Sequence, residues 1–141
     1  MELTPLVSLD FVVRDPAGRI LVGYRRNRPA QGYWFVPGGR VGKNETRRAA
    51  FARLTVAELG VELSFDQARF IGVFEHLYND NFSGTGEFGT HYVVLGYAIE
   101  TDPALLRLPP DDQHGGYLWL SEAEIQERAD VHGYTKAYCG L

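Results

Sequence analysis

Residues 36–61, VPGGRVGKNETRRAAFARLTVAELGV, decide the fold of this chain. The segment opens with a Pro-Gly-Gly turn at 37–39, where no side chain keeps the backbone away from a ligand. A helical pattern follows from about Glu45 to Leu59 and ends at Gly60, a residue type typical of helix C-caps. A glycine loop that leads into a helix with acidic residues predicts a place to hold a metal-bound diphosphate.

The spacing within residues 39–61 resembles the Nudix box, G-x5-E-x7-R-E-U-x-E-E-x-G-U, in which U is an aliphatic residue. The matching residues are Gly39, Glu45, Arg53, Glu58, Gly60 and Val61. An ordinary amphipathic helix with the same spacing by chance is the alternative, and the preceding glycines disfavour it.

Three departures from the box change the chemistry that it predicts. Leu54 and Ala57 stand where the family usually has glutamates, and Thr55 replaces an aliphatic residue. Positions 54, 57 and 58 share one face of a helix, which a full box makes a cluster of carboxylates. Only Glu58 remains as an acid on that face, so the helix can supply a ligand to one cation rather than to several.

Composition bounds the class of protein. The 141 residues are 45% hydrophobic, which fits a single domain over residues 1–141 with a real core. A net charge of −4 argues against nucleic-acid binding as the main role. Cys139 is the only cysteine, and the start MELTPLVSLD has neither a basic n-region nor a long apolar run. These features predict a soluble cytoplasmic protein with no membrane partner.

Alternating and apolar runs predict the other elements. Strands are expected at residues 6–13, 19–24, 69–78, 90–100 and 117–120, a helix from Ser121 to about Arg128, and a final helix over 131–141. The order of these elements predicts an α+β fold, an α-β-α sandwich in which helices flank a mixed β-sheet.

Two polar residues fall inside predicted strands. Asp10 in a buried strand needs a partner or a ligand, and the alternative is an acid at a strand end that faces solvent. His76 lies in the strand over 69–78, where a lone histidine is usually structural.

Arginines cluster beside the glycine turn. Arg25, Arg26 and Arg28 follow a strand, and Arg40 follows the paired glycines. The guanidinium fork suits phosphate recognition because it pairs with two oxygens at once. A solvated basic rim is the alternative.

Motifs outside the box extend the resemblance over nearly the whole chain. PLVSLDF, NRPAQGYWFVPGGRV, AELG, DNFSGT, THYVVLGY and the pair Gln113-His114 look like those of GDP-mannose mannosyl hydrolase, the sugar-releasing Nudix subfamily. The resemblance implies the Nudix fold, a homodimer, and metal-dependent hydrolysis of GDP-mannose or GDP-glucose to GDP and free hexose. In that subfamily water attacks the anomeric carbon, with inversion of configuration.

The same resemblance implies a metal site. Glu58, the Gly39 carbonyl and Gln113 would bind one Mg²⁺, for which Mn²⁺ can substitute, with diphosphate oxygens and water as further ligands. Arg53 is expected to pair with Glu45 and to hold the shape of the loop and helix.

The remaining implied roles concern proton transfer and the leaving group. His114 is the candidate base, and an exposed loop histidine is the alternative reading of it. Arg25 and Arg40 would stabilise charge on the departing GDP, and Tyr92 would donate a hydrogen bond to it. Asp10 and His76 match positions that contact the sugar or assist the reaction.

Two other functions compete with this one. An ordinary Nudix pyrophosphohydrolase would yield GMP and a hexose 1-phosphate, and Leu54 and Ala57 disfavour it. A non-catalytic domain that binds nucleotide sugars is disfavoured by the presence of Glu58, Gln113 and His114.

Overall fold

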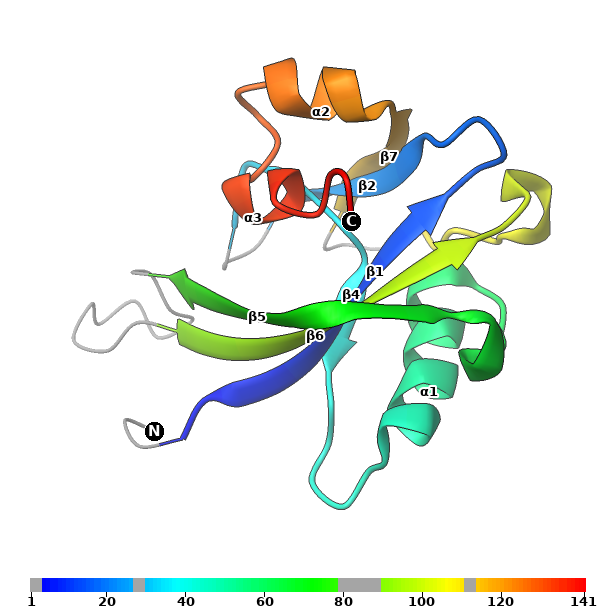
Figure 1. The fold of residues 1–141 in the computed structure, drawn as a ribbon, viewed down its shortest axis with the longest axis vertical. Coiled ribbons are helices and arrows are strands. Elements are labelled where there is room, and N and C mark those ends of the chain that lie inside the picture. The colour runs from blue at the N-terminus through cyan, green and yellow to red at the C-terminus, as the bar shows by residue number, and fades with distance from the viewer. Residues whose placement is uncertain (1–3, 27–29, 79–89, 111–113) are drawn as a thin grey trace.

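The computed structural model describes residues 4–26, 30–78, 90–110 and 114–141. Within these ranges the strands form one sheet in the order β3-β2-β1-β6-β5, with β4 paired to β1 and β7 paired to β2 (Figure 1). The strands are Leu6–Arg14 (β1), Ile20–Arg25 (β2), Trp34–Phe35 (β3), Gly38–Arg40 (β4), Arg69–Tyr78 (β5), Thr90–Glu100 (β6) and His114–Leu120 (β7). Strand β1 is parallel to β6 and antiparallel to β2 and β4, so the sheet is mixed, as predicted.

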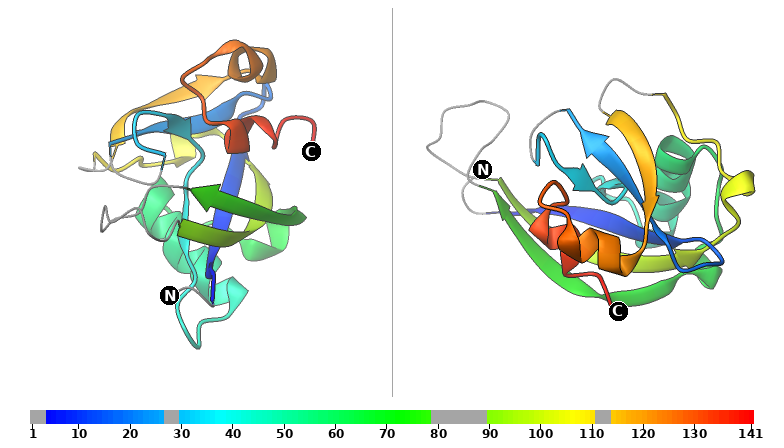
Figure 2. Two further views of the ribbon diagram at one scale, coloured as in Figure 1. Left: turned by 90° about the vertical axis from the view of Figure 1, so that its left-hand side faces the viewer. Right: turned by 90° about the horizontal axis from the view of Figure 1, so that it is seen from above.

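Helices cover both faces of this sheet. The helix α1 (Arg47–Leu59) lies on one face, and α2 (Glu122–Glu127) and α3 (Gly133–Lys136) lie on the other (Figure 2). Two short 3₁₀ turns at Phe65–Gln67 and Pro103–Leu105 complete the regular structure of the described ranges. The layered arrangement expected from the sequence, with helices on both faces of a mixed sheet, is confirmed.

The central strand β1 sends alternate side chains to the two layers. Leu9 and Phe11 are fully buried in the cluster that includes residues of α1. Val12 belongs to the opposite cluster, together with Tyr138 near the C-terminus. Because side chains alternate along a strand, Asp10 points to the same side as Val12, toward the C-terminal segment.

Local hydrogen bonds fix both ends of α1. The Thr46 hydroxyl accepts a bond from the Ala49 N–H at the start. Gly60 ends the helix with φ 76° and donates to the Val56 carbonyl, so the predicted C-cap is confirmed. The helix begins two residues after the predicted Glu45, because Thr46 is the N-cap and Glu45 belongs to the preceding loop.

That loop is braced by one ion pair. Arg53 Nε lies 2.8 Å from Glu45 Oε2, and Arg53 Nη2 donates to Glu45 Oε1 at 2.9 Å and to the Arg40 carbonyl at 2.8 Å. Glu45 also accepts a bond from the Gly42 N–H. The Arg53 hydrogen bonds are the largest cause that lowers the Glu45 pKa to about 2. The predicted pairing of Arg53 with Glu45 is confirmed.

The C-terminal region differs from the prediction in one element. The helix predicted from Ser121 is present as α2, and a capping box formed by Ser121 and Glu124 starts it. The predicted final helix over 131–141 is present but much shorter, because only Gly133–Lys136 is α-helical. The N–H groups of Tyr138 and Cys139 bond three residues back, so the chain closes in tighter turns there.

Strand β7 begins earlier than the predicted Tyr117. Its backbone pairs with β2 from His114 onward, with His114 opposite Arg25 across an irregular register. The sequence placed His114 in the loop before this strand. That prediction is wrong, because His114 is the first residue of the strand.

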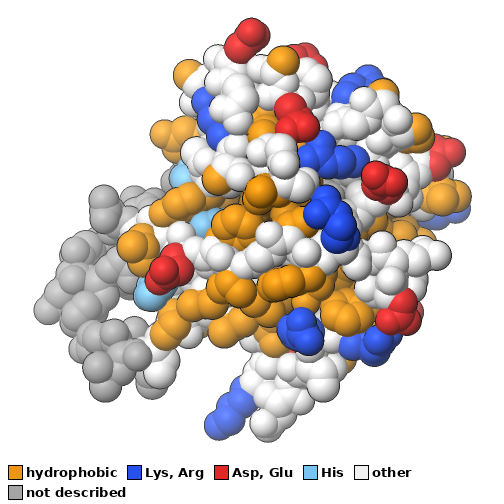
Figure 3. Space-filling model, viewed as in Figure 1, with side chains coloured by type: hydrophobic (Ala, Val, Ile, Leu, Met, Phe, Trp, Pro, Cys, Tyr) orange, Lys and Arg blue, Asp and Glu red, His pale blue; other side chains and the backbone are white. Residues whose placement is uncertain are grey.

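Strand β5 lies at the end of the strand order of the described sheet. Phe70, Val73 and Leu77 on it are exposed, and Figure 3 shows hydrophobic side chains in a band over this side of the molecule. Among the described residues, each helix is too short or too polar to cross a bilayer.

Candidate active site

One cavity of about 230 Å³ opens where strands β1 to β6 meet. Its walls are Ser8, Asp10, Arg25, Ala30, Phe35, Val36, Gly38, Gly39, Arg40, His76, Tyr78 and Tyr92. Six of the nine residues proposed from the sequence lie on this wall: Asp10, Arg25, Gly39, Arg40, His76 and Tyr92. These six residues come from five different strands and converge on one small space.

The paired glycines let strand β4 approach β1 and α1 closely. A Cβ atom on Gly38 would lie 2.2 Å from the Leu9 carbonyl oxygen and 2.9 Å from Asp10 Oδ1. A Cβ atom on Gly39 would lie 2.5 Å from Cδ2 of Leu54. Glycine is thus required at position 38, where the neighbour is backbone, whereas a Cβ at position 39 would force the Leu54 side chain to move. The backbone of β4 forms part of the cavity wall.

Asp10 is the buried acid of the cavity. Its exposed fraction is 6%, and its Oδ2 accepts a hydrogen bond of 2.6 Å from the Tyr138 hydroxyl. Burial raises its pKa to about 7, although the Tyr138 hydrogen bond and the Arg25 charge both act to lower it. Near neutral pH this carboxyl can therefore give or take a proton. The reading of Asp10 as a solvent-facing acid is wrong.

His76 is a neutral neighbour of Asp10. Its exposed fraction is 4%, and its Nδ1 lies 3.9 Å from Asp10 Oδ2. The ring stacks on Tyr134 with centroids 4.1 Å apart and planes 3° apart. Burial, with a smaller contribution from His132, lowers the His76 pKa to about 4. At neutral pH the imidazole is uncharged and can offer hydrogen bonds without a positive charge.

Two arginines make the cavity attractive to anions. Arg25 is half-buried, and its Nε is buried without a hydrogen-bond partner among the described residues. Arg40 is exposed at the cavity wall. Burial raises the pKa of Tyr92, and the charges of Arg40 and Arg25 partly offset this effect, so the phenol stays protonated. An orphaned buried donor beside a second cation fits a bound phosphate group.

The metal ligands proposed from the sequence are only partly described. Glu58 lies half-buried in the last turn of α1, one helical turn beyond Leu54, which contacts Gly39. Gln113 falls outside the described residues. Within the described part of the chain, no group of three or more His, Cys, Asp or Glu could hold a metal ion. A donor set of one carboxylate and one backbone carbonyl is too small for a multi-metal cluster; it suits a single divalent cation whose other ligands would come from substrate and water.

For His114, the proposed base, the structure gives the position of the backbone. His114 begins β7, and its main chain lies opposite Arg25, a residue of the cavity wall. This pairing places the backbone at the start of β7 beside the backbone of Arg25.

Sequence reasoning missed several aromatic residues of the site. Tyr78 could have been found, because it lies two residues after His76 and so points to the same side of β5. Tyr138 had no such signal, because its bond to Asp10 joins residues 128 positions apart. The contact of Tyr134 with His76 could not be predicted either, because the segment over 131–141 was expected to form a regular helix.

Comparisons with known proteins agree with this fold. The NUDIX domain model matches residues 4–139. Low-salt glycan biosynthesis protein Agl8 of Haloferax volcanii is 42% identical over 134 residues, which are 95% of this chain and 80% of that protein. A MutT NUDIX hydrolase from Burkholderia pseudomallei superposes with a TM-score of 0.74 and 25% identity over 95% of both chains. The NUDIX domain of Shewanella oneidensis NrtR, complexed with ADP ribose, shares the fold at a TM-score of 0.65 and 15% identity, covering 91% of this chain and 80% of that one.

Proposed function

Since this chain belongs to the Nudix family of hydrolases, we propose that it hydrolyses GDP-mannose, and also GDP-glucose, to GDP and the free hexose. The proposal rests chiefly on one observation: Leu54, at a position where the family usually has a glutamate, is buried in the core, while the titratable carboxyl of Asp10 lies in the cavity, outside the box helix. A group that can give or take a proton is thus available outside the box helix. Attack of water on the sugar carbon requires such a group near the sugar.

The diphosphate would bind at the cationic side of the cavity. Arg25 offers a buried N–H that has no described partner, and Arg40 adds a second charge at the cavity wall. Glu58, the Gly39 carbonyl and Gln113 would hold one Mg²⁺ or Mn²⁺. When bound, that cation supplies charge neutralisation at the diphosphate as GDP departs.

The leaving group also needs a proton donor or a neutral hydrogen bond. Tyr92 lines the cavity, and burial keeps its phenol protonated. It can therefore donate a hydrogen bond to the oxygen on which negative charge develops, and both arginines reinforce that stabilisation.

The sugar would lie at the end of the cavity that holds Asp10 and His76. Both side chains are buried and line the wall, so their polar atoms can hold sugar hydroxyls away from bulk water. His114, which follows the proposed ligand Gln113, would take the proton of the attacking water. The water would then attack the anomeric carbon from the side opposite to GDP and invert its configuration.

A nucleotide-sugar substrate is compatible with the relative from Haloferax volcanii, whose name places it in glycan biosynthesis. The cytoplasmic location and the homodimer expected from the sequence stay predictions. The exposed apolar edge of β5 is a surface on which dimer formation can be tested by substitution of Val73.

Chromatography of the products tests this proposal. The protein is incubated with GDP-mannose and Mg²⁺, and the nucleotide and sugar products are separated. We expect GDP and mannose in equal amounts. GMP with mannose 1-phosphate would instead identify an ordinary Nudix pyrophosphohydrolase, and unchanged substrate that nevertheless binds would identify a non-catalytic nucleotide-sugar-binding domain.

A further inference from the structure

The C-terminal segment reaches the buried acid of the cavity through one side chain. The Tyr138 hydroxyl donates a hydrogen bond of 2.6 Å to Oδ2 of Asp10. Tyr138 is 1% exposed and Asp10 is 6% exposed, so water does not compete strongly for this bond. The bond joins the first strand of the sheet to the last turns of the chain.

Packing fixes the direction of this hydroxyl. The Tyr138 ring lies edge-on to Phe74, with centroids 4.9 Å apart, and belongs to the core cluster that contains Val12. The ring therefore has little freedom to turn its hydroxyl elsewhere. Tyr138 is absent from the described residues that line the cavity, so it contacts Asp10 rather than a ligand.

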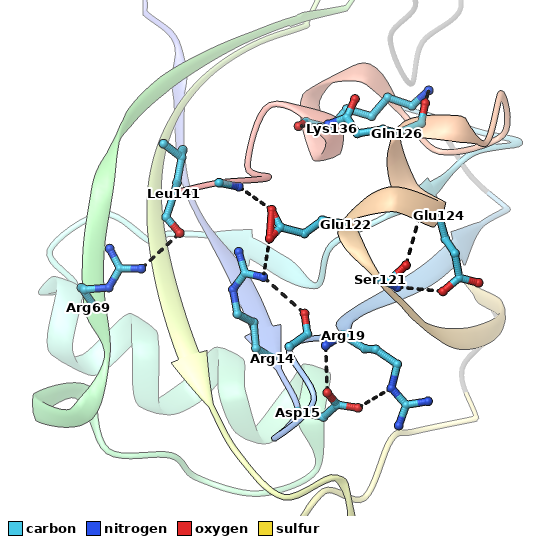
Figure 4. Close-up of polar contacts among 12 residues, drawn as sticks. Arg14, Asp15, Arg19, Arg69, Ser121, Glu122, Glu124, Gln126, Lys136 and Leu141 are labelled. Carbon is cyan, nitrogen blue, oxygen red and sulfur yellow. Dashed lines mark hydrogen bonds and ion pairs between the residues drawn. The ribbon is translucent and has the colours of Figure 1, made fainter.

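The segment that carries Tyr138 is held on both sides. Before it, the Tyr134 hydroxyl accepts a bond from the Leu77 N–H and donates one to the Leu77 carbonyl, both at 2.8 Å. After it, the Gly140 N–H donates to Glu122 at 2.6 Å (Figure 4). The Leu141 carbonyl accepts a bond of 3.1 Å from Arg69 of β5 (Figure 4). These contacts fix the segment against strand β5 and helix α2.

The two oxygens of Asp10 consequently differ in their surroundings. Oδ2 accepts the Tyr138 bond and lies 3.9 Å from Nδ1 of His76, whereas Oδ1 lies beside Gly38; His76 and Gly38 both form part of the cavity wall. We propose that Tyr138 is a positioning residue: it holds Oδ2 of Asp10 so that Oδ1 is presented to the sugar in the cavity. This inference rests on the proposed function, because it takes a sugar hydroxyl as the group that meets Oδ1.

Removal of the hydroxyl alone tests the inference. Tyr138→Phe keeps the ring and its contact with Phe74, but it leaves the Asp10 carboxyl free to turn. We expect kcat to fall by about 10- to 100-fold, the range that corresponds to a hydrogen bond to a charged group. KM should stay within about twofold, since the diphosphate contacts are unchanged.

A double-mutant cycle separates positioning from general damage. In an Asp10→Asn background, measured by single turnover with excess enzyme, Tyr138→Phe should cause no further loss. Tyr97→Phe is the matched control, because Tyr97 is 2% exposed, its hydroxyl accepts a bond from Arg47, and it packs in the opposite core cluster. We expect Tyr97→Phe to retain wild-type kcat, whatever its melting temperature.

Two results would overturn the inference: wild-type kcat in Tyr138→Phe, or an equal loss in the presence and absence of the Asp10 carboxylate. If Tyr138→Phe does not fold, the infrared C=O stretch of protonated Asp10, identified by its absence in Asp10→Asn, decides instead. A lowered frequency supports the bond to Tyr138, and an unshifted one contradicts it. Products other than GDP and hexose would refute the proposed function. The double-mutant cycle of Asp10→Asn and Tyr138→Phe, measured on the same substrate, would still decide the role of Tyr138.

Discussion

Leu54 of α1 packs directly against Gly39 of β4, so closely that a Cβ atom on Gly39 would lie 2.5 Å from Cδ2 of Leu54. Leu54 is 5% exposed and belongs to the core cluster on the α1 face of the sheet. Leu54 occupies a position where the Nudix box usually has a glutamate, and in this protein it is part of the hydrophobic core.

Restoring the missing glutamate should damage the fold rather than create a metal cluster. Leu54→Glu removes buried apolar atoms and buries a charge, so the free energy of unfolding should fall by about 3 kcal/mol or more. Ala57→Glu at an exposed box position is the control, and it should change that free energy by less than about 0.5 kcal/mol. Urea denaturation measures both variants. A Leu54→Glu protein of wild-type stability would contradict the packing role.

Glu58 should govern metal dependence more than folding. Glu58→Gln removes the proposed carboxylate ligand, so the Mg²⁺ concentration for half-maximal activity should rise at least about tenfold. The melting temperature should change little, because the residue is only half-buried. Glu62→Gln, at an exposed position just past α1, is the matched control. Unchanged turnover of Glu58→Gln at limiting Mg²⁺ would exclude the ligand role.

Asp10 and His76 should have opposite effects on stability as pH changes. The pKa of Asp10 is about 7 in the folded protein and ordinarily 3.8. Between these pH values the folded protein holds a proton on Asp10 that the unfolded chain has lost, so the free energy of unfolding falls as pH rises. The pKa of His76 is about 4 and ordinarily 6.5, so its contribution increases stability over that range as pH rises. In the wild type the two contributions largely cancel between about pH 4 and 6.5.

Single substitutions should separate these contributions. Between pH 4 and pH 7, the unfolding free energy of His76→Phe should itself fall by up to about 4 kcal/mol, because only the Asp10 contribution remains, whereas that of the wild type should change much less. Asp10→Asn should instead gain stability from pH 4 to 6.5. Urea titrations across this range measure both slopes. Curves parallel to that of the wild type would show that neither group is perturbed by burial.

His114 should control the rate of the chemical step. His114→Gln removes the proposed general base, so kcat should fall by about 10²–10⁴-fold, while the Mg²⁺ affinity stays near that of the wild type. His91→Gln is the matched control, because His91 is exposed and is not among the described residues of the cavity wall. A His114→Gln enzyme with wild-type kcat would assign the base to another residue.

Local patterns in the sequence were sufficient to predict most of the fold. The strands at Arg69–Tyr78 and Thr90–Glu100 match the predicted ranges, because runs of β-branched and aromatic residues bounded by loops are a local signal. The C-cap at Gly60 and the capping box at Ser121 are likewise set by a few adjacent residues.

Long-range contacts explain what the sequence could not predict. Positions 54, 57 and 58 were expected to share one metal-facing side of α1, but Leu54 is buried whereas Ala57 is exposed. Which side of α1 packs into the core depends on how closely β4 approaches the helix at Gly39. Helical periodicity does not specify this approach. The partner of Asp10 was equally hidden, since Tyr138 reaches it only after the whole sheet has formed.

Hydrolysis in ¹⁸O-enriched water tests attack at the anomeric carbon most directly. The reaction is run with GDP-mannose, and both products are analysed by mass spectrometry at short times. Mannose incubated in the same water is the control, because free sugars exchange their anomeric oxygen with solvent. We predict GDP without label and ¹⁸O in mannose above the control. Label in a phosphate group would show attack at phosphorus and would contradict the proposed reaction.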